Sequence, residues 1–161
     1  MRRSDRSMER EESLEFLETA AVARMGMIAD GEPYVVPLHF VLMDDQIYFH
    51  SAPEGRKIRA LQENPSVCLE VDVFYGIRDD KVPCSMGTYF RSVMVFGEAT
   101  AVVDPAEAIN ALEALVDKHS RRPDRSAITE DDMDQVVVMK ISPEHITGKV
   151  LDAPAALREP V

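Results

Sequence analysis

The segment YVVPLHFVLMDDQIYFHSAPEGRK, residues 34–57, contains the patterns that decide the fold of this chain. Two runs rich in β-branched and aromatic residues, 34–43 and 46–50, flank a turn made of two aspartates, which predicts a pair of antiparallel strands. Upstream, residues 21–29 form a third strand-like run that ends at an Asp-Gly pair, a strong hairpin signal. Three strands joined by tight turns predict an antiparallel meander.

The chain downstream continues as strands with short helices between them. Residues 55–63 predict a helix, which Asn64-Pro65 ends. Residues 67–74 alternate between apolar and other side chains, as a strand with two different faces does. The longest β-like stretch is 89–103, in which Gly97 predicts a bulge or bend.

Two helices, a loop and one strand complete the predicted architecture. Residues 11–20 have helical apolar spacing, and Asp104-Pro105-Ala106-Glu107 has the N-cap and proline of a second helix start. The polar segment 121–134 predicts a surface loop, and 136–141 a final strand. About six antiparallel strands with peripheral helices predict a mainly β or α+β fold, a small closed or partly closed barrel.

Composition limits the partners. At 161 residues and 45% hydrophobic, the chain fits one domain, which we place at residues 1–150, with a C-terminal tail or arm at 151–161. A net charge of −11 argues against nucleic acid and anionic membranes, and favours a small molecule or a protein as partner. No apolar segment resembles a secretory signal or a membrane span. Two cysteines without a CxxC indicate a reducing cytoplasm.

Three cations are candidate anion ligands. Arg56 and Lys57 follow Gly55 at a helix start, where free N–H groups favour an anion such as phosphate, and Ser51 adds a hydroxyl. The alternative is a solvated helix end. Arg91 lies among apolar strand residues, where a charge needs a partner. That partner is a ligand anion, or a carboxylate such as Glu70 or Asp72 in an ion pair that only helps packing.

His39 and His50 lie on two of the predicted strands and are candidates to flank one pocket. Their role is either proton transfer to a ligand or structural packing in the core. No two histidines or cysteines have a standard metal-ligand spacing, so we expect no metal site. The chain has no GxSxG, P-loop or GxGxxG motif, which removes the usual support for hydrolase, nucleotide-triphosphate and Rossmann functions.

Residues 31–72, GEPYVVPLHFVLMDDQIYFHSAPEGRKIRALQENPSVCLEVD, followed by TYFRSVMVFGEATAVVD at 88–104, resemble the flavin-binding split barrel of the pyridoxamine phosphate oxidase superfamily. Within it, the chain is most similar to the nitroimidazole-resistance (Nim) proteins. The resemblance implies a six-stranded antiparallel split barrel and a homodimer with two flavin sites at its interface. FMN is the implied cofactor, with FAD as the alternative.

The resemblance also assigns site residues. VVPLHF matches the strand beside the flavin ring, HSAPEGRK the block that holds the phosphate, and FRSV a segment that completes the site from a later strand. The implied cofactor-binding residues are Pro37, Leu38, His39, His50, Ser51, Arg56, Lys57, Arg91 and Ser92. His39 and His50 are the implied proton-relaying residues. Related Nim proteins often have asparagine in place of His39 and a tryptophan in the loop that reads CSMGT here, so the substrate side differs.

The implied activity is that of a flavin-dependent reductase that acts on a small electron-poor compound such as a nitroimidazole, with NAD(P)H or another compound as the electron donor that reduces the flavin again. The protein would orient the flavin and its substrate and tune the flavin potential. One alternative is a flavin, heme or deazaflavin carrier or sensor of the same fold. The other is a pyridoxamine phosphate oxidase, although the C-terminal substrate residues of that enzyme are not recognisable in VVVMKISPEHITGKV.

Overall fold

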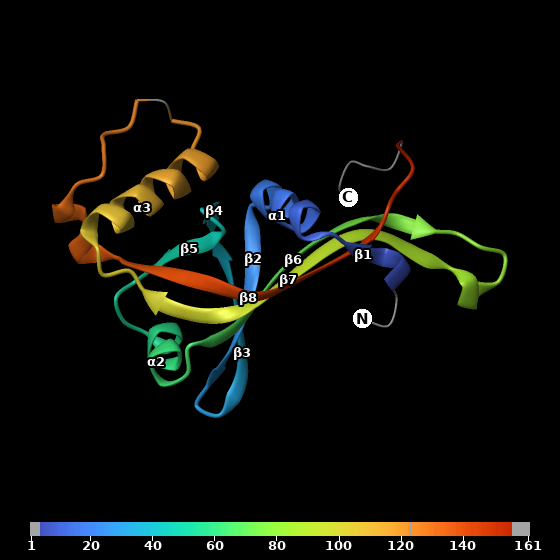
Figure 1. Cartoon of the computed structure of the whole chain (residues 1–161), viewed down its shortest axis with the longest axis horizontal. Coiled ribbons are helices and arrows are strands. Elements are labelled where there is room, and N and C mark those ends of the chain that lie inside the picture. The colour runs from blue at the N-terminus through green and yellow to red at the C-terminus, as the bar shows by residue number, and fades with distance from the viewer. Residues whose placement is uncertain (1–3, 123, 156–161) are drawn as a thin grey trace.

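The computed structural model describes residues 4–122 and 124–155 (Figure 1). Its helices are α1 (Arg10–Thr19), α2 (Arg56–Glu63) and α3 (Pro105–His119), with short 3-10 helices η1 (Ser4–Arg6), η2 (Pro83–Ser85) and η3 (Glu130–Gln135). Its strands are β1 (Ser7–Met8), β2 (Val22–Ala29), β3 (Glu32–His39), β4 (Val41–Met43), β5 (Gln46–Ser51), β6 (Ser66–Arg78), β7 (Gly87–Ala101) and β8 (Val137–Leu151). No helix in these ranges is both long and apolar enough to cross a membrane.

One antiparallel sheet with the order β3-β2-β6-β7-β8-β5-β4 organises the molecule, and the short β1 pairs with β8 beside that path. β3 and β4 stand at opposite ends of this order, although only Phe40 separates them in the chain. The sheet must therefore curl until its two ends meet. No ladder joins β3 to β4 within the described ranges, so the barrel is split rather than closed, which confirms the predicted fold. Each of the six longer strands overlaps one of the six predicted strands.

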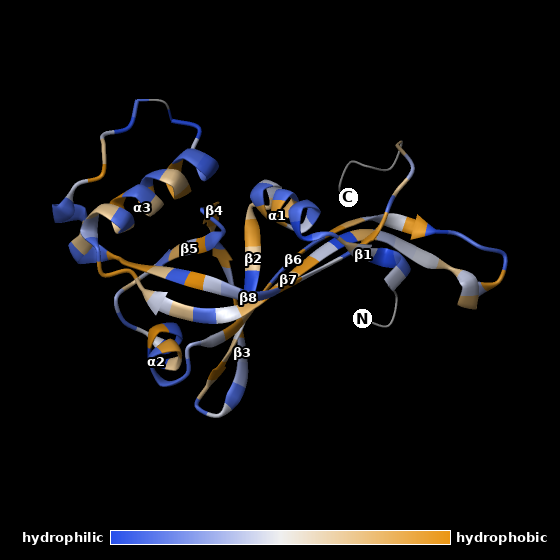
Figure 2. Cartoon of the chain, in the orientation of Figure 1, coloured by the Kyte–Doolittle hydropathy of each residue, from blue (hydrophilic) through white to orange (hydrophobic). Residues whose placement is uncertain are grey.

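The main hydrophobic core fills the inside of the curled sheet. Its largest fully buried side chains include Phe40, Phe49, Leu17, Met25 and Ile47. Burying a side chain of this size stabilises the fold by about 1.5–3 kcal/mol relative to exposure. A second cluster lies between α3 and the β4, β5 and β8 strands. Figure 2 shows the alternation along the strands that produces one buried and one exposed face.

Helix α3 begins as predicted and is docked by a polar network. The Asp104 carboxylate accepts a hydrogen bond from the Ala106 backbone N–H at 3.1 Å, which caps the helix. The Tyr48 hydroxyl and the Lys140 ammonium both donate to Glu107 Oε1, each at 2.8 Å. Burial and then the bond to Glu107 raise the pKa of Tyr48 to about 12, so it stays a donor. The network ties α3 to β5 and β8.

The predicted meander was wrong. Residues 34–43 do not form one strand, because the chain divides at Phe40 into β3, which pairs with β2, and β4, which pairs with β5. β3 and β5 are not neighbours in the sheet. Residues 34–43 are mostly apolar because they pass through the barrel core, and an apolar run does not report which strand it pairs with.

The predicted last strand was too short. β8 continues past Ile141 to Leu151, because β7 offers it a long edge and the ladder satisfies its backbone. Pro143 and Gly148 hide the alternation of this part in the sequence. The predicted bulge is confirmed, since the β7–β8 register slips between Phe96 and Gly97. A Cβ on Gly97 would collide with the Ser142 carbonyl oxygen.

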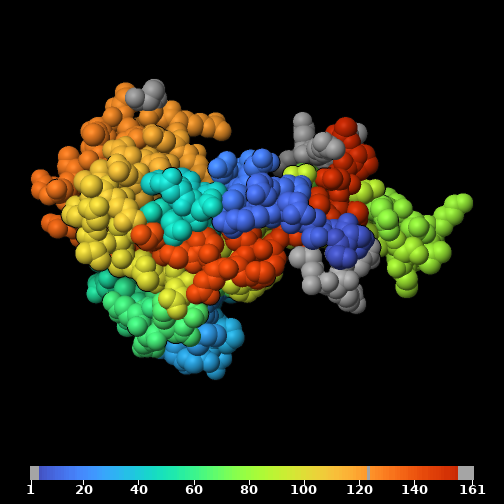
Figure 3. Space-filling view, viewed as in Figure 1, coloured from blue at the N-terminus to red at the C-terminus, as the bar shows by residue number. Residues whose placement is uncertain are grey.

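β6 and β7 extend beyond the barrel as a two-stranded arm, which stands away from the body at the right of Figures 1 and 3. Several apolar side chains along it are exposed, and between 41% and 56% of each is accessible: Phe74, Ile77, Val82 and Met86. The arm therefore exposes several large apolar side chains to solvent in a single chain.

Candidate functional site

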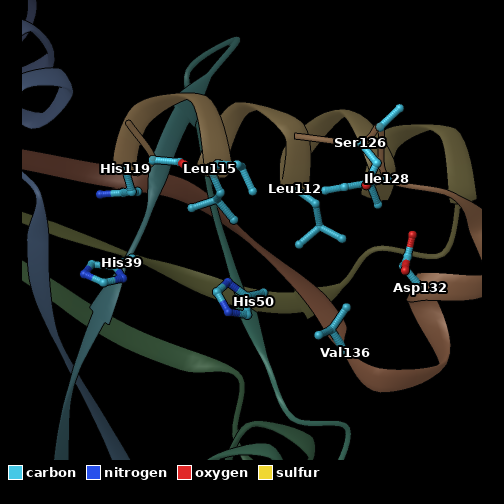
Figure 4. A pocket seen from close by; sticks show the side chains of 12 residues that line it. His39, His50, Leu112, Leu115, His119, Ser126, Ile128, Asp132 and Val136 are labelled. Carbon is cyan, nitrogen blue, oxygen red and sulfur yellow. The ribbon is translucent and has the colours of Figure 1, made fainter. Parts of the chain in front are cut away.

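A pocket of about 530 Å³ lies between α3, the segment that follows it, and the ends of β3 and β5 (Figure 4). Its walls are mostly apolar: Leu112, Leu115, Val116, Ala127, Ile128 and Val136. Figure 4 shows His39 and His119 at one end, Ser126 and Asp132 toward the other, and His50 below the helix. An apolar cavity of this size with a few polar groups is typical of a small-molecule site. The structure thus brings the two predicted histidines to one pocket.

His39 and His119 form a stacked pair. Their ring centroids are 4.6 Å apart and the planes differ by 29°. His119 Nε2 lies 3.2 Å from the Phe40 carbonyl oxygen, and because a carbonyl only accepts, the network assigns the hydrogen to this nitrogen. Burial lowers the pKa of His119, the bond to Phe40 opposes this, and the charges of His39 and Lys118 lower it further.

The side chains of His50 and Lys57 are near enough for the charge of Lys57 to lower the pKa of His50. The His50 ring is exposed to the pocket, yet its packed surroundings lower its pKa, and the charges of Lys57 and His39 lower it further. Lys57 is half-buried, with Nζ 5.6 Å from the centre of the Phe49 ring, and burial lowers its pKa. It has no hydrogen bond or ion pair to any residue in the described ranges. Lys57 is therefore a partly desolvated cation without a counter-charge.

Arg56, the other predicted phosphate ligand, is already engaged. Its Nε donates to Asp30 Oδ2 at 3.2 Å, and its guanidinium lies 4.6 Å from the centre of the Tyr34 ring. An exposed ion pair of this kind contributes about 0–1 kcal/mol, so it is readily exchanged for another anion. Ser51, the last residue of β5, is buried and pairs with Val137 of β8.

Pro37 and Leu38 lie on β3, an edge strand of the sheet. The Leu38 side chain is buried in the core and Pro37 is exposed. Only one side of an edge strand is paired, so backbone groups on its other side are free to meet a ligand. The position is compatible with the predicted role of this strand beside a flavin ring.

Arg91 and Ser92 do not join the pocket within one chain. Arg91 Nη2 is 3.2 Å from Asp152 Oδ1 and 3.5 Å from Glu12 Oε1, beside the arm. Ser92 lines a different groove of about 460 Å³ on the outer face of β7 and β8, with Lys149. Of the predicted cofactor-binding residues, His39 and His50 therefore line the pocket, and Lys57 lies near enough to His50 to lower its pKa. Arg91 and Ser92 lie elsewhere in a single chain.

The predicted carboxylate partners of Arg91 were wrong. Arg24 NH1 instead binds Asp72 Oδ1 at 2.7 Å and Glu70 Oε2 at 3.3 Å. In the β6–β7 register Asp72 stands opposite Ser92, whereas Arg91 stands opposite Val73. Successive side chains point to opposite faces of a sheet, so these carboxylates and Arg91 lie on different faces.

One known protein family matches nearly the whole length of the fold. The family model of pyridoxamine 5'-phosphate oxidase matches residues 9–150, from the start of α1 to the end of β8. This chain belongs to that family. An uncharacterized protein of Rhizobium meliloti (strain 1021) is 32% identical over 84 residues, and the alignment spans 52% of this chain and 55% of that protein.

Solved structures of family-like proteins are similar over most of the chain. A candidate 5-nitroimidazole antibiotic resistance protein from Bacteroides thetaiotaomicron has a TM-score of 0.76 at 28% identity, over 89% of this chain and 86% of that one. An FAD-binding protein from Mesorhizobium loti has 0.66 at 26%, over 91% and 98%. The flavocytochrome Anf3 from Azotobacter vinelandii has 0.83 at 24%, over 100% and 74%, which supports the fold alone.

For this member of the family, sequence reasoning missed the contribution of α3 to the pocket. The sequence analysis predicts a helix that starts at Asp104-Pro105, but it assigns none of the three α3 residues Leu112, Leu115 and His119 to the site. The three residues have the spacing i, i+3, i+7, which places them on one helix face and was a usable signal. Within 4–122 and 124–155, no three His, Cys, Asp or Glu side chains are grouped closely enough to hold a metal ion.

Proposed function

We propose that this protein binds a flavin nucleotide, FMN with FAD as the alternative, and uses it to reduce a small electron-poor compound. The observation that carries the proposal is Lys57, a half-buried cation near the pocket histidine His50 that has no counter-charge among residues 4–122 and 124–155. A phosphate would neutralise it, and the start of α2 adds free N–H groups and a favourable dipole. Arg56 would exchange its Asp30 contact for the same phosphate.

The remaining residues fit the other parts of a flavin. Pro37, Leu38 and His39 would hold the ring beside the edge of β3, and Ser51 would contribute near the phosphate. A bound flavin supplies hydride or single-electron transfer. The chain itself excludes water through the apolar wall of α3, and it supplies imidazole groups at His39 and His50 that can donate or accept a proton beside the substrate.

We further propose that the working form is a homodimer. The β2–β3, β2–β6 and β6–β7 ladders place Val35, Gly26, Cys68 and Phe96 in one row across the outer sheet face. That face is partly apolar, with Val35 61%, Ile28 43%, Met94 39% and Phe96 38% exposed. A second copy packed on it would remove this surface from water. Arg91 and Ser92 of the second copy would then complete a site that one chain leaves without them.

The first test is the absorption spectrum of the purified protein, with any released cofactor identified by mass. Flavin bands, a dimeric mass by light scattering, and oxidation of the chemically reduced flavin by 2-methyl-5-nitroimidazole are the expected results. A protein that neither carries nor takes up FMN or FAD would refute the proposal. Flavin binding without reoxidation by this compound or turnover of pyridoxamine phosphate would leave a carrier or sensor, the alternative kept open by the sequence.

A further inference from the structure

The stack of His39 on His119 joins β3 to α3 at one end of the pocket. His39 is exposed and has two rotatable bonds, so its ring alone would sample several rotamers. At 4.6 Å between centroids and 29° between planes, the two rings are within the range of aromatic stacking. The contact therefore gives the His39 ring a preferred orientation at the pocket wall.

His119 is in turn fixed at the last position of α3. Its Nε2 donates to the Phe40 carbonyl oxygen at 3.2 Å, and Phe40 is fully buried directly after His39 in the chain. The neighbouring Lys118 places its buried ammonium 4.1 Å from the centre of the Phe40 ring. The end of α3 thus supplies the His119 ring that stacks on His39. It also contacts Phe40, the residue that follows His39 in the chain.

We propose that His119 is a positioning residue, which orients the His39 imidazole toward a substrate in the pocket. The consequence for turnover rests on the proposed flavin function, whereas the positioning itself does not. Because the α3 wall that lines the pocket also carries His119, the cavity shape and the orientation of His39 are set by the same helix. A misplacement of about 1 Å can cost a catalytic group up to about a hundredfold in rate.

Two variants of His119 separate the stack from the hydrogen bond. His119→Phe keeps an aromatic ring against His39 but removes the donor to Phe40. His119→Gln removes the ring but keeps an amide N–H, whose nitrogen can occupy the position of the imidazole Nε2. In flavin-free wild-type protein, NMR should show a nuclear Overhauser effect between the two imidazoles, and the three-bond couplings of His39 should indicate one preferred rotamer. That rotamer preference should persist in His119→Phe and be lost in His119→Gln.

In flavin-loaded protein, the probe is 2-methyl-5-nitroimidazole, with NADPH in excess as the hydride donor that reduces the flavin again after each turnover. His119→Gln and His119→Ala should lower kcat about tenfold with KM changed less than about twofold, and His119→Phe should recover most of the loss. Asn110→Ala, an exposed position on the same helix, is the matched control and should leave kcat unchanged. Flavin content should be equal in all variants.

The absence of the ring-to-ring effect in wild-type protein, an unchanged kcat in His119→Ala, or a loss of flavin in His119→Ala would each overturn the positioning role. If the wild-type protein takes up no flavin, the proposed function fails, and the NMR comparison of the two variants still decides whether His119 orients His39.

Discussion

Lys57→Met is the sharpest test of where the flavin phosphate binds. The ammonium lies among packed atoms beside His50, has no counter-charge in the described chain, and its pKa is lowered by burial. A hydrogen bond to a charged group contributes about 1.5–3 kcal/mol. Its loss should weaken FMN binding by about ten- to a hundredfold. Methionine retains the apolar length of the side chain, so the packing against Phe49 is largely preserved.

The same change should not destabilise the flavin-free protein. A cation whose pKa is lowered by burial is held at a cost to the fold, which an uncharged side chain removes. We therefore expect the thermal midpoint of flavin-free Lys57→Met to equal or exceed that of the wild type. FMN affinity would fall while the stability of the flavin-free fold is kept, which is the trade-off expected where a binding residue is held at a cost to the fold.

Two arginines on α2 provide comparisons. Arg56→Met should weaken FMN binding by less than about fivefold, because Arg56 leaves an existing pair with Asp30 to meet the phosphate and exposed pairs contribute little. Arg59→Met, an exposed position on the same helix, removes the same charge and should change affinity by less than about twofold.

The assay is quenching of flavin fluorescence, with riboflavin as the ligand that lacks the phosphate. The ratio of riboflavin to FMN dissociation constants should collapse toward one in Lys57→Met and stay at its wild-type value in Arg59→Met. Equal losses of riboflavin and FMN affinity in Lys57→Met would refute the phosphate assignment, as would unchanged FMN affinity.

Three further predictions concern the fold and its charge. Gly97→Ala should destabilise the protein by about 3 kcal/mol in urea unfolding, because the new Cβ meets the Ser142 carbonyl oxygen; a loss under about 1 kcal/mol would contradict the close packing of β7 on β8. Tyr48→Phe should cost about 1–2 kcal/mol through its bond to Glu107, and an unchanged midpoint would show that this bond does not dock α3. Because the folded pKa of His50 is lowered, the unfolded state binds more protons below about pH 6.5, so stability should fall on acidification. The fall should be smaller in His50→Gln, and an equal fall in both proteins would rule out His50 as its source.

Local signals predicted local features well. The Asp104 cap, the end of α2 before Asn64-Pro65 and the bulge at Gly97 were all found where the sequence placed them. The cap and the helix end depend on groups close together in the chain, a side-chain oxygen that meets a nearby N–H and a proline that limits the residue before it. The bulge is marked by the glycine itself, although its cause is the approach of Ser142 on β8. The strand partners were predicted less well, because alternation along a strand shows its faces and not its neighbours.

By itself, the sequence determined the helices, most strands, the turns and the cations at the start of α2, and its resemblance to a flavin-binding family identified the split barrel. Only the tertiary structure decided that Arg56 binds Asp30 while Lys57 has no counter-charge in the part of the chain that the structure describes, and that His119 stacks on His39. It also decided that Arg91 lies apart from the pocket. These contacts join residues distant in the chain, and they depend on how the sheet curls across Phe40 and where α3 docks. Burial and pairing of charge are properties of that arrangement, which no local pattern of residues encodes.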